Sequence, residues 1–409
     1  MKPKQIMLIA GEASGDMLAA ELVGALREEL TATRSNYATT DSQPLHTGLE
    51  PRFFGAGGAR MKAAGVELAF DLTEHSVIGI SDVLKNYLKF RRLFNQLLKL
   101  AIERQPDVII GVDYGGFNLR FGHAIKKYVR KHSGALHDWN PKIVQFISPQ
   151  VWASRASRAF QLERDYDLLL SIFPFEKEWY TKRVPKLRVE FVGHPMVERF
   201  ASEGRVPRVP ELETFGTRSA HSSEILLLPG SRTGELRRHL PVMLDAVKLI
   251  QQKQSDVYAK MVLPNNTLAE LAKALGSADV KIQIGQLHEA LAQADVAIAS
   301  TGTVTMECAF FGVPTVTLYK TSHLTYEIGK RIVKVKSLTM PNLMAGEEVY
   351  PEFIQDAATP ENISRAALEL LQNESRRTQI KTKLAEIISS LGGPGASQRA
   401  AKAITSLLG

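Results

Sequence analysis

Four short segments of this 409-residue chain bring small, hydroxyl and charged residues together directly after apolar runs. They are residues 11–16, 111–118, 228–235 and 299–307. Small residues let the backbone turn sharply and let a ligand approach, and free N–H groups at a helix start attract an anion. The first segment lacks the G-x-G-x-x-G spacing of a dinucleotide site, so an NAD site is not expected.

Asp113, directly after the apolar run 108–112, is the candidate for proton transfer. A carboxylate at a rigid strand end, partly removed from water, can have its pKa raised toward the working pH, as a general base requires. An Asp at this place can equally cap the following helix, and position alone leaves both roles open. Glu12 and Ser14 lie in segment 11–16, for which a plain turn with an Asp cap is the competing interpretation.

The third and fourth segments have residues that favour the binding of a diphosphate group. A guanidinium beside backbone N–H groups at a helix start suits a leaving group whose negative charge grows as a glycosidic bond breaks. In the fourth segment, Glu307 stands about one turn into a helix and can accept hydrogen bonds from a ribose diol. Together these two loops predict a nucleotide-diphosphate donor. The residues concerned are Gly230, Ser231, Arg232 and Glu235 in the third segment and Gly302, Thr303 and Glu307 in the fourth.

Strand and helix patterns alternate along the chain, and each of the four segments follows a strand pattern. The strand runs are continuously apolar, as in parallel sheets covered by helices on both faces. We therefore predict an α/β protein with a doubly wound domain over residues 1–200 and a second one over 201–374. The helical stretch from about 375 to 409 is expected to pack back on the first domain. Ligands of such sheets bind beyond the strand C-terminal ends, so the four segments are expected around a common cleft.

Composition narrows the class of protein. Hydrophobic residues make up 44% and charged residues 23%, as in a soluble globular protein. The net charge of +8 favours an anionic partner: nucleic acid, an acidic membrane surface or a phosphorylated substrate. Cys308 is the only cysteine, which excludes an internal disulfide and fits a reducing compartment. The histidines are scattered without ligand spacing, so no metal site is predicted.

An amphipathic pattern covers residues 81–105. At helical spacing, Leu97 and Leu98 fit a core-facing stripe, but the apolar residues before them are too dense for one buried stripe. Basic amphipathic segments lie in the plane of an anionic bilayer. The segment therefore predicts peripheral membrane binding near an acceptor mouth. The residues concerned are Val83, Leu84, Tyr87, Leu88, Arg91 and Arg92.

Seven motifs together resemble, in order and spacing, those of the lipid-A-disaccharide synthase family, over nearly the whole chain. The resemblance implies an inverting, metal-independent glycosyltransferase of GT-B fold, with two Rossmann-like domains facing a central cleft. Such enzymes join UDP-2,3-diacylglucosamine to 2,3-diacylglucosamine 1-phosphate, giving the β-1,6-linked lipid A disaccharide and UDP. The motifs are GEASGD (11–16), GVD with FN (111–118), SPQVWA (148–153), FPFE (173–176), GHP (193–195), LPGSR with E (228–235) and LTMPNL (338–343).

The resemblance also assigns residues. The family's essential carboxylate falls on Asp113, its UDP-contacting arginine on Arg232 and its SLPN asparagine on Asn342. Glu12 and Ser14 are placed in the N-terminal loop and Glu307 in the donor-side helix. No cofactor besides the UDP-sugar substrate is implied. One departure stands out: the family reads GIDYPDFN, whereas Gly115-Gly116 replaces Pro-Asp here.

Other functions stay open at this point. A different GT-B enzyme that uses UDP-GlcNAc would share the donor loops but lack GEASGD and SPQVWA together. The Gly115-Gly116 departure allows a catalytically inactive relative that binds lipid. A nucleic-acid-binding module is disfavoured because the basic residues are spread and no recognised motif is present. A cytoplasmic protein, peripheral on the inner face of the inner membrane, is expected; its oligomeric state, a homodimer included, is left open.

Overall fold

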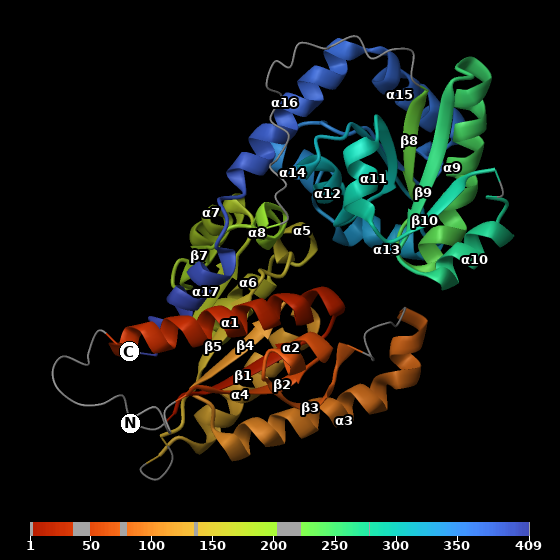
Figure 1. The fold of residues 1–409 in the computed structure, drawn as a ribbon. Helices are drawn as coiled ribbons and strands as arrows, with labels where there is room; N and C mark the ends of the chain where they lie inside the picture. The colour runs from red at the N-terminus through yellow and green to blue at the C-terminus, as the bar shows by residue number, and fades with distance from the viewer. Residues whose placement is uncertain are drawn as a thin grey trace. The chain divides into compact units, whose positions relative to one another are not determined.

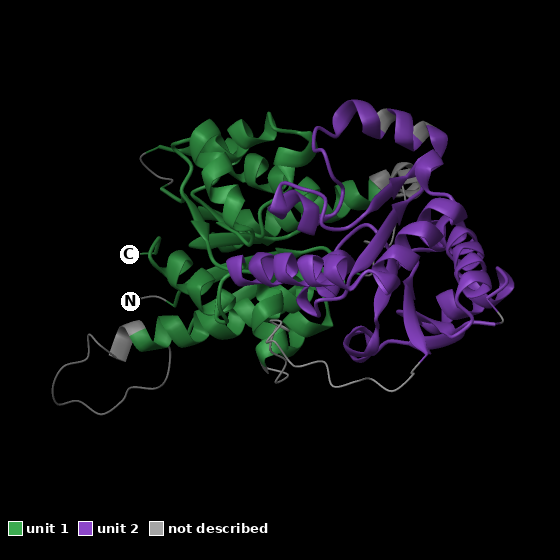
Figure 2. Cartoon of the chain, turned by 90° about the horizontal axis from the view of Figure 1, so that it is seen from above, with its two compact units in different colours: residues 1–204, 391–409 green, residues 205–390 purple. Residues whose placement is uncertain are grey.

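The computed structural model describes residues 3–35, 50–73, 80–134, 138–202, 222–277 and 279–408, with only the backbone for 33–35, 80–87, 202, 324 and 328. The chain divides into two compact units (Figure 2). Unit 1 comprises Met1–Gly204 and Leu391–Gly409, and unit 2 comprises Arg205–Ser390. Each unit is built on a parallel sheet, so the prediction of two α/β domains is confirmed.

Unit 1 has a seven-stranded sheet in the order β3-β2-β1-β4-β5-β6-β7 (Figure 1). The order reverses direction at β1, between β2 and β4, as in doubly wound folds. Its strands are β1 (Gln5–Ala10), β2 (Arg52–Gly57), β3 (Glu67–Asp71), β4 (Val108–Val112), β5 (Lys142–Phe146), β6 (Leu168–Ser171) and β7 (Val189–Phe191). Its helices are α1 (Ala13–Ser35), α2 (Ala59–Ala63), α3 (Ile80–Arg104), α4 (Gly115–His132), α5 (Val151–Ser154), α6 (Arg158–Asp165), α7 (Pro174–Arg183), α8 (Pro195–Ser202) and α17 (Ala396–Thr405).

Unit 2 has a six-stranded sheet in the order β10-β9-β8-β11-β12-β13. Its strands are β8 (Ser223–Leu228), β9 (Val257–Leu263), β10 (Lys281–Ile284), β11 (Val296–Ser300), β12 (Thr315–Tyr319) and β13 (Glu352–Ile354). Its helices are α9 (Thr233–Lys253), α10 (Asn266–Ala274), α11 (Leu287–Gln293), α12 (Val304–Phe310), α13 (His323–Ile332), α14 (Met340–Ala345), α15 (Pro360–Gln372) and α16 (Glu374–Ser390), with a 3₁₀ turn at Gln355–Ala357.

Burial explains why the central strands form. Every residue of β4 and β11 is buried, because helices cover both faces of each sheet. In unit 1, α1 and α17 lie on one face of the sheet and α3 and α4 on the other (Figure 1). β4 can therefore be apolar throughout, and β11 is apolar up to its last residue, Ser300.

The C-terminal region is shared between the units. Helix α16 packs on α12 and α14 within unit 2, whereas α17 packs on α1 and α8 within unit 1. Arg399 ties the last segment to unit 1: its Nε donates to Val192 O at 2.7 Å and its Nη2 to Gly393 O at 2.7 Å. The main-chain N–H of His194 donates to Leu391 O at 2.9 Å. The C-terminal segment, where the chain returns to unit 1, therefore packs against the GHP motif.

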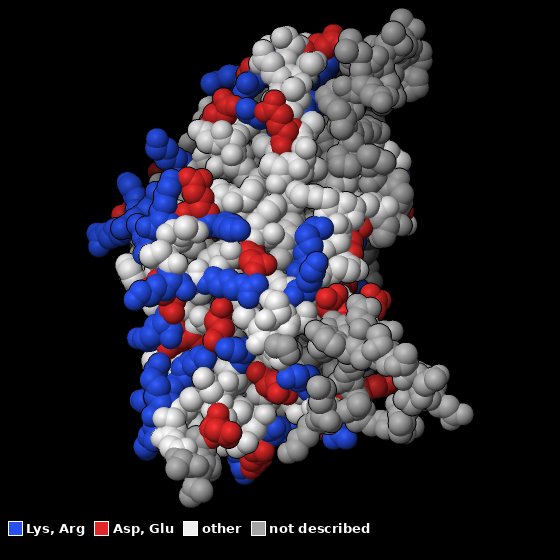
Figure 3. All heavy atoms as spheres, turned by 90° about the vertical axis from the view of Figure 1, so that its left-hand side faces the viewer, with Lys and Arg blue, Asp and Glu red and all other residues white. Residues whose placement is uncertain are grey.

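Helix α3 carries the predicted membrane segment. Leu97 is fully buried and Leu98 packs against the core, as the periodicity predicted. Leu88 is 77% exposed, and Arg91 and Arg92 are exposed too, while the side chains of Val83, Leu84 and Tyr87 lie outside the described residues. On the face drawn in Figure 3, Lys and Arg side chains are interspersed with Asp and Glu. In the described part of the chain, no helix combines the length and apolarity needed to cross a bilayer.

Candidate active site

Asp113 occupies a strained turn at the end of β4. Its φ is +51° and that of Tyr114 is +45°, so two consecutive side-chain-bearing residues are left-handed. Each such residue costs about 1–3 kcal/mol and persists only where the surroundings enforce it, commonly at functional sites. The Asp113 N–H donates to Phe146 O at 2.9 Å, and its carbonyl accepts from the side-chain amides of Asn118 and Gln145.

The electrostatics of Asp113 fit a proton acceptor. Burial raises the pKa of its carboxyl, and the negative charge of Glu12 raises that pKa further. A hydrogen bond from the Tyr114 N–H lowers it and offsets part of this effect. The pKa of Tyr114 is raised as well, by burial and by Glu12. A carboxylate held above its ordinary pKa at a strand end can accept a proton from a substrate hydroxyl.

The 11–16 loop lies against this turn, and the absence of a side chain at Gly11 allows this contact. A Cβ at Gly11 would stand 2.3 Å from the Tyr114 ring, and one at Gly15 would stand 3.7 Å from Asp113 Cβ. Glu12 is half-buried and Ser14 is exposed at the start of α1. The structure thus brings Glu12 and Asp113 into electrostatic contact across about 100 residues of sequence.

Asp16, the last residue of GEASGD, is a helix cap, although not for its own helix. Its buried carboxylate accepts the backbone N–H groups of Gly58 at 2.7 Å, Arg60 at 2.9 Å and Met61 at 3.1 Å. These are the otherwise unpaired donors at the start of α2. Asp16 therefore ties α1 to the β2–α2 turn, and its carboxylate caps α2 instead of the helix in whose first turn it lies.

The two glycines that replace Pro-Asp behave differently. A Cβ at Gly115 would lie 2.7 Å from Pro149 Cβ, so a larger residue requires this segment to shift. A Cβ at Gly116 would meet no atom within 4 Å. Gly116, in the first turn of α4, stands where the resemblance expects a second aspartate, and this position is sterically open in this chain.

Glu176 is a buried carboxylate to which the motifs alone gave no role. Fully buried in the first turn of α7, it accepts Trp152 Nε1–H at 3.0 Å and the Phe173 N–H at 3.3 Å. Burial raises its pKa to about 7, although these hydrogen bonds oppose the rise. Glu176 thereby joins the FPFE motif to SPQVWA. An acidic residue among aromatic ones was the signal in the sequence.

His194 is expected to be neutral. Burial and the nearby Arg199 lower its pKa to about 4, and its Nδ1 accepts the Met196 N–H at 3.1 Å. The imidazole thus caps the start of α8, whereas the main-chain N–H of His194 holds the C-terminal segment. It is not arranged as a cationic group in this structure.

In unit 2, the 229–232 loop is shaped by Glu235. The Ser231 N–H donates to Glu235 Oε2 at 3.2 Å, and a Cβ at Gly230, whose φ is +117°, would lie 2.5 Å from that oxygen. Glu235 therefore folds back on the loop. Arg232 is 77% exposed in its side chain and stands 3.9 Å from Glu235, which leaves its guanidinium accessible to an anion.

A buried histidine fixes this loop to the sheet. His239 Nδ1 lies 2.9 Å from Pro229 O, and its Nε2 accepts the Lys320 N–H at 3.0 Å. Since Nε2 accepts, Nδ1 carries the proton and the ring is neutral. Burial lowers the pKa of His239, consistent with that state. The arginine loop is thereby held between the ends of β8 and β12.

The fourth segment opens α12. Gly302 has a φ of +138° and open space around it, and Thr303 is exposed at the N-cap. Glu307 is half-buried, and its Oε2 lies 3.2 Å from His288 Nε2. The His288 ring stacks on Phe311 at 5.8 Å between centroids. His288, which the sequence did not single out, thus orients the Glu307 carboxylate.

Asn342 lies in the interior of unit 2. Its amide donates to Tyr350 O and Glu352 Oε1, both at 2.8 Å, and its Oδ1 accepts the N–H groups of Val349 and Tyr350. All four hydrogen-bonding positions of the amide are used within the protein. Glu352 also accepts from the N–H groups of Leu338 and Thr339. Asn342 and Glu352 therefore hold the LTMPNL segment in place.

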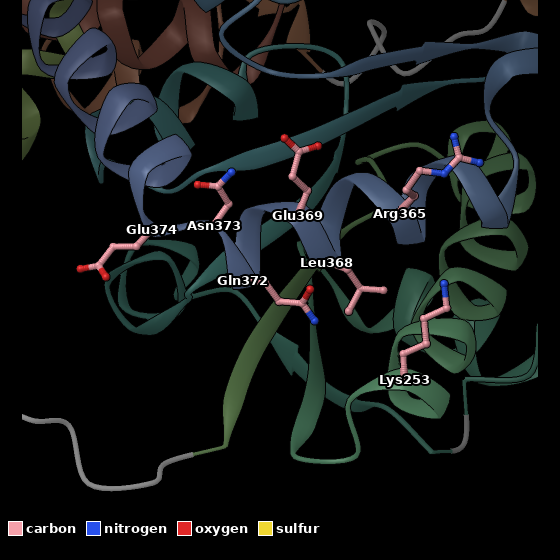
Figure 4. Close-up of a pocket in the computed structure, with 7 residues that line it drawn as sticks. All are labelled: Lys253, Arg365, Leu368, Glu369, Gln372, Asn373 and Glu374. Atoms are coloured by element: carbon pink, nitrogen blue, oxygen red, sulfur yellow. The ribbon is translucent and has the colours of Figure 1, made fainter.

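A groove between helix ends lies away from these loops (Figure 4). It includes Lys253 at the end of α9, whereas the arginine loop is at the start of that helix, about 30 Å away at 1.5 Å per residue. Among the described residues, no group of three or more His, Cys, Asp or Glu side chains could hold a metal ion. The groove is lined by Lys253, Arg365, Leu368, Glu369, Gln372, Asn373 and Glu374.

Comparison with known proteins agrees with the motifs. A profile of the family described as "Lipid-A-disaccharide synthetase" matches residues 6–406. The lipid-A-disaccharide synthase of Trichlorobacter lovleyi is 36% identical, covering 100% of this chain and 98% of its own. That of Geobacter metallireducens is 34% identical, covering 99% and 98%. The resemblance drawn from the motifs is therefore confirmed.

Solved structures share the fold at low identity. A UDP-GlcNAc 2-epimerase from Neisseria meningitidis, bound to UDP-GlcNAc, aligns with a TM-score of 0.57 and 12% identity over 100% of this chain and 99% of its own. The calicheamicin glycosyltransferase CalG4 aligns with a TM-score of 0.55 and 15% identity over 100% and 99%. These similarities support the predicted GT-B fold.

Proposed function

The chain belongs to the lipid-A-disaccharide synthase family of glycosyltransferases, and we propose that it joins UDP-2,3-diacylglucosamine to 2,3-diacylglucosamine 1-phosphate. The acceptor 6-hydroxyl oxygen attacks the donor anomeric carbon, and the bond from that carbon to the diphosphate breaks. The electron pair leaves with UDP, and the configuration inverts to give the β-1,6 linkage.

The placement of Asp113 is the observation that carries this proposal. Its carboxylate stands at the end of a rigid central strand and has a raised pKa. It is the group we assign to accept the proton of the attacking hydroxyl. Glu12 supports that role through its charge. A base whose pKa lies nearer the working pH transfers the proton more effectively than an ordinary carboxylate does.

The leaving UDP is assigned to the loops of unit 2. Arg232 and the start of α9 offer a guanidinium and backbone N–H groups to the diphosphate, and the Gly302–Thr303 turn offers a second anion-accepting helix start. Glu307, oriented by His288, is assigned to the ribose hydroxyls. In this scheme the arginine and N–H groups stabilise the growing charge without a metal ion. Asn342 acts indirectly, by holding its segment.

The lipid substrates are assigned to a membrane surface next to α3. Leu88 exposes 77% of its surface, and Arg91 and Arg92 are exposed within one turn of it. An exposed apolar side chain beside two cations fits the interface of an anionic bilayer. Acylated substrates would be taken from that surface.

The test is replacement of Asp113. In Asp113→Ala, kcat for disaccharide formation should fall by about 10²–10⁴-fold, the usual contribution of general acid–base catalysis. Calorimetric UDP affinity should stay within twofold, because the donor loops belong to unit 2. Asp113→Asn, which keeps the size of the side chain, is the matched variant and should be equally slow. A fully active Asp113→Ala enzyme would overturn the proposal.

A further inference from the structure

Three left-handed residues lie at the ends of two neighbouring strands. Asp113 and Tyr114 directly follow β4, and Ile147, with a φ of +67°, directly follows β5. A positive φ is rare for any side-chain-bearing residue and is a genuine outlier for a β-branched one. The two turns are joined directly, since the Asp113 N–H donates to Phe146 O at 2.9 Å.

Two buried amides hold these turns. Gln145, fully buried in β5, places its Nε2 2.9 Å from Asp113 O, 3.3 Å from Phe146 O and 3.1 Å from Ile147 O. Asn118, 2% exposed on α4, donates from Nδ2 to the same Asp113 carbonyl at 2.8 Å. The Asp113 carbonyl thus accepts hydrogen bonds from both amides, and the Gln145 amide contacts both turns.

The amide orientations follow from their surroundings. The neighbours of Gln145 Nε2 are carbonyl oxygens, so an NH₂ group and not an oxygen must face them. As a consequence, Gln145 Oε1 and Asn118 Oδ1 are buried with no hydrogen-bond partner among the described residues. Both amides crowd Gly111, where a Cβ would stand 2.8 Å from each. A native protein rarely keeps two unpaired buried acceptors, and such groups call for an explanation.

We propose that Gln145 and Asn118 are positioning residues that hold the Asp113–Tyr114 turn left-handed and so aim the Asp113 carboxylate at the acceptor hydroxyl. The inference rests on the proposed role of Asp113 as the base. Neither amide is assigned a contact with substrate. The unpaired oxygens are then the consequence of directing both NH₂ groups at the backbone of the catalytic turn.

The test combines Gln145→Met with Asp113→Ala. Gln145→Met keeps the length of the side chain and removes the donors. It should lower kcat by about 10–100-fold, as a misplacement of about 1 Å does. KM and UDP affinity should stay within twofold. In the Asp113→Ala background the same change should have less than a twofold effect, because residues that act as a unit are not additive. Gln161→Met removes another amide-to-carbonyl bond in unit 1, to Leu119 O at 3.0 Å, and should retain wild-type kcat.

The outcomes separate the two proposals. Wild-type kcat in Gln145→Met, or equal fold-losses in both backgrounds, would overturn the positioning role. An active Asp113→Ala enzyme would instead remove the proposed base. Should circular dichroism show that Gln145→Met does not fold, Asn118→Leu tests the same idea. It breaks one of the two bonds to Asp113 O and should lower kcat at least fivefold in the wild-type background only.

Discussion

Replacing Glu176 by Gln should change how the stability of unit 1 depends on pH. The pKa of Glu176 is raised to about 7 by burial, whereas an ordinary glutamate has a pKa of 4.5. Between these values the folded chain binds a proton that the unfolded chain releases. The free energy of unfolding therefore falls as pH rises through this window, and the loss is complete above about pH 7.

The size of the effect follows from the two pKa values. Linkage gives a loss of about 2–3 kcal/mol between pH 5 and pH 8 from Glu176 alone. The glutamine side chain of the variant would not titrate. Only its Oε1 can accept a hydrogen bond, so either the Trp152 or the Phe173 donor would lose its partner, at a cost of about 1 kcal/mol. The difference in unfolding free energy between Glu176→Gln and the wild type should thus move by about 2–3 kcal/mol in favour of the variant from pH 5 to pH 8.

Urea unfolding followed by tryptophan fluorescence is the assay. The chain has three tryptophans, and all of them, at 139, 152 and 179, belong to unit 1. The signal therefore reports on the unit that contains Glu176. Glu178→Gln is the control, since Glu178 lies on the same helix, is exposed and pairs with Lys182. Parallel pH curves for Glu176→Gln and the wild type would refute the reasoning.

Three further predictions concern catalysis and binding. Arg232→Ala should weaken UDP binding by about 1.5–3 kcal/mol, as for a charged hydrogen bond, and Arg232→Lys should recover only part; unchanged calorimetric affinity would contradict the assignment. Glu12→Gln should move the acid limb of the kcat/KM profile to lower pH, because removing the charge of Glu12 lowers the raised pKa of Asp113. Glu178→Gln is the control, and an acid limb at the same pH in both variants would show that Glu12 and Asp113 are not coupled. Replacing Arg91 and Arg92 by Ser should weaken binding to anionic vesicles by about 1 kcal/mol per charge at low salt. Replacing Val83, Leu84 and Leu88 by Ser should release the protein from the vesicles with its UDP affinity intact. Unfolding of this triple variant would instead identify those side chains as core residues.

The sequence by itself determined the fold class and the segments in which the candidate site residues lie. Continuous apolar runs followed by glycine-containing turns predicted two doubly wound domains, and both sheets are parallel. Segments such as 111–118 were found because a polar residue directly after a fully buried strand must stand at the sheet edge. These are local properties, because hydrophobic periodicity and turn-forming residues depend only on residues that are close together in the sequence.

Tertiary structure alone decided what each polar residue contacts. Glu12 raises the pKa of Asp113, Gln145 bonds a carbonyl 32 residues away, and His239 reaches Lys320. Asp16 caps a helix that starts more than 40 residues later. Each partner is set by which strands become neighbours and how their ends align, and a short directional hydrogen bond depends on that geometry to within a few tenths of an ångström. The sequence therefore supplied the groups at the edge of the sheet, whereas the packing of the sheet selected which of them meet.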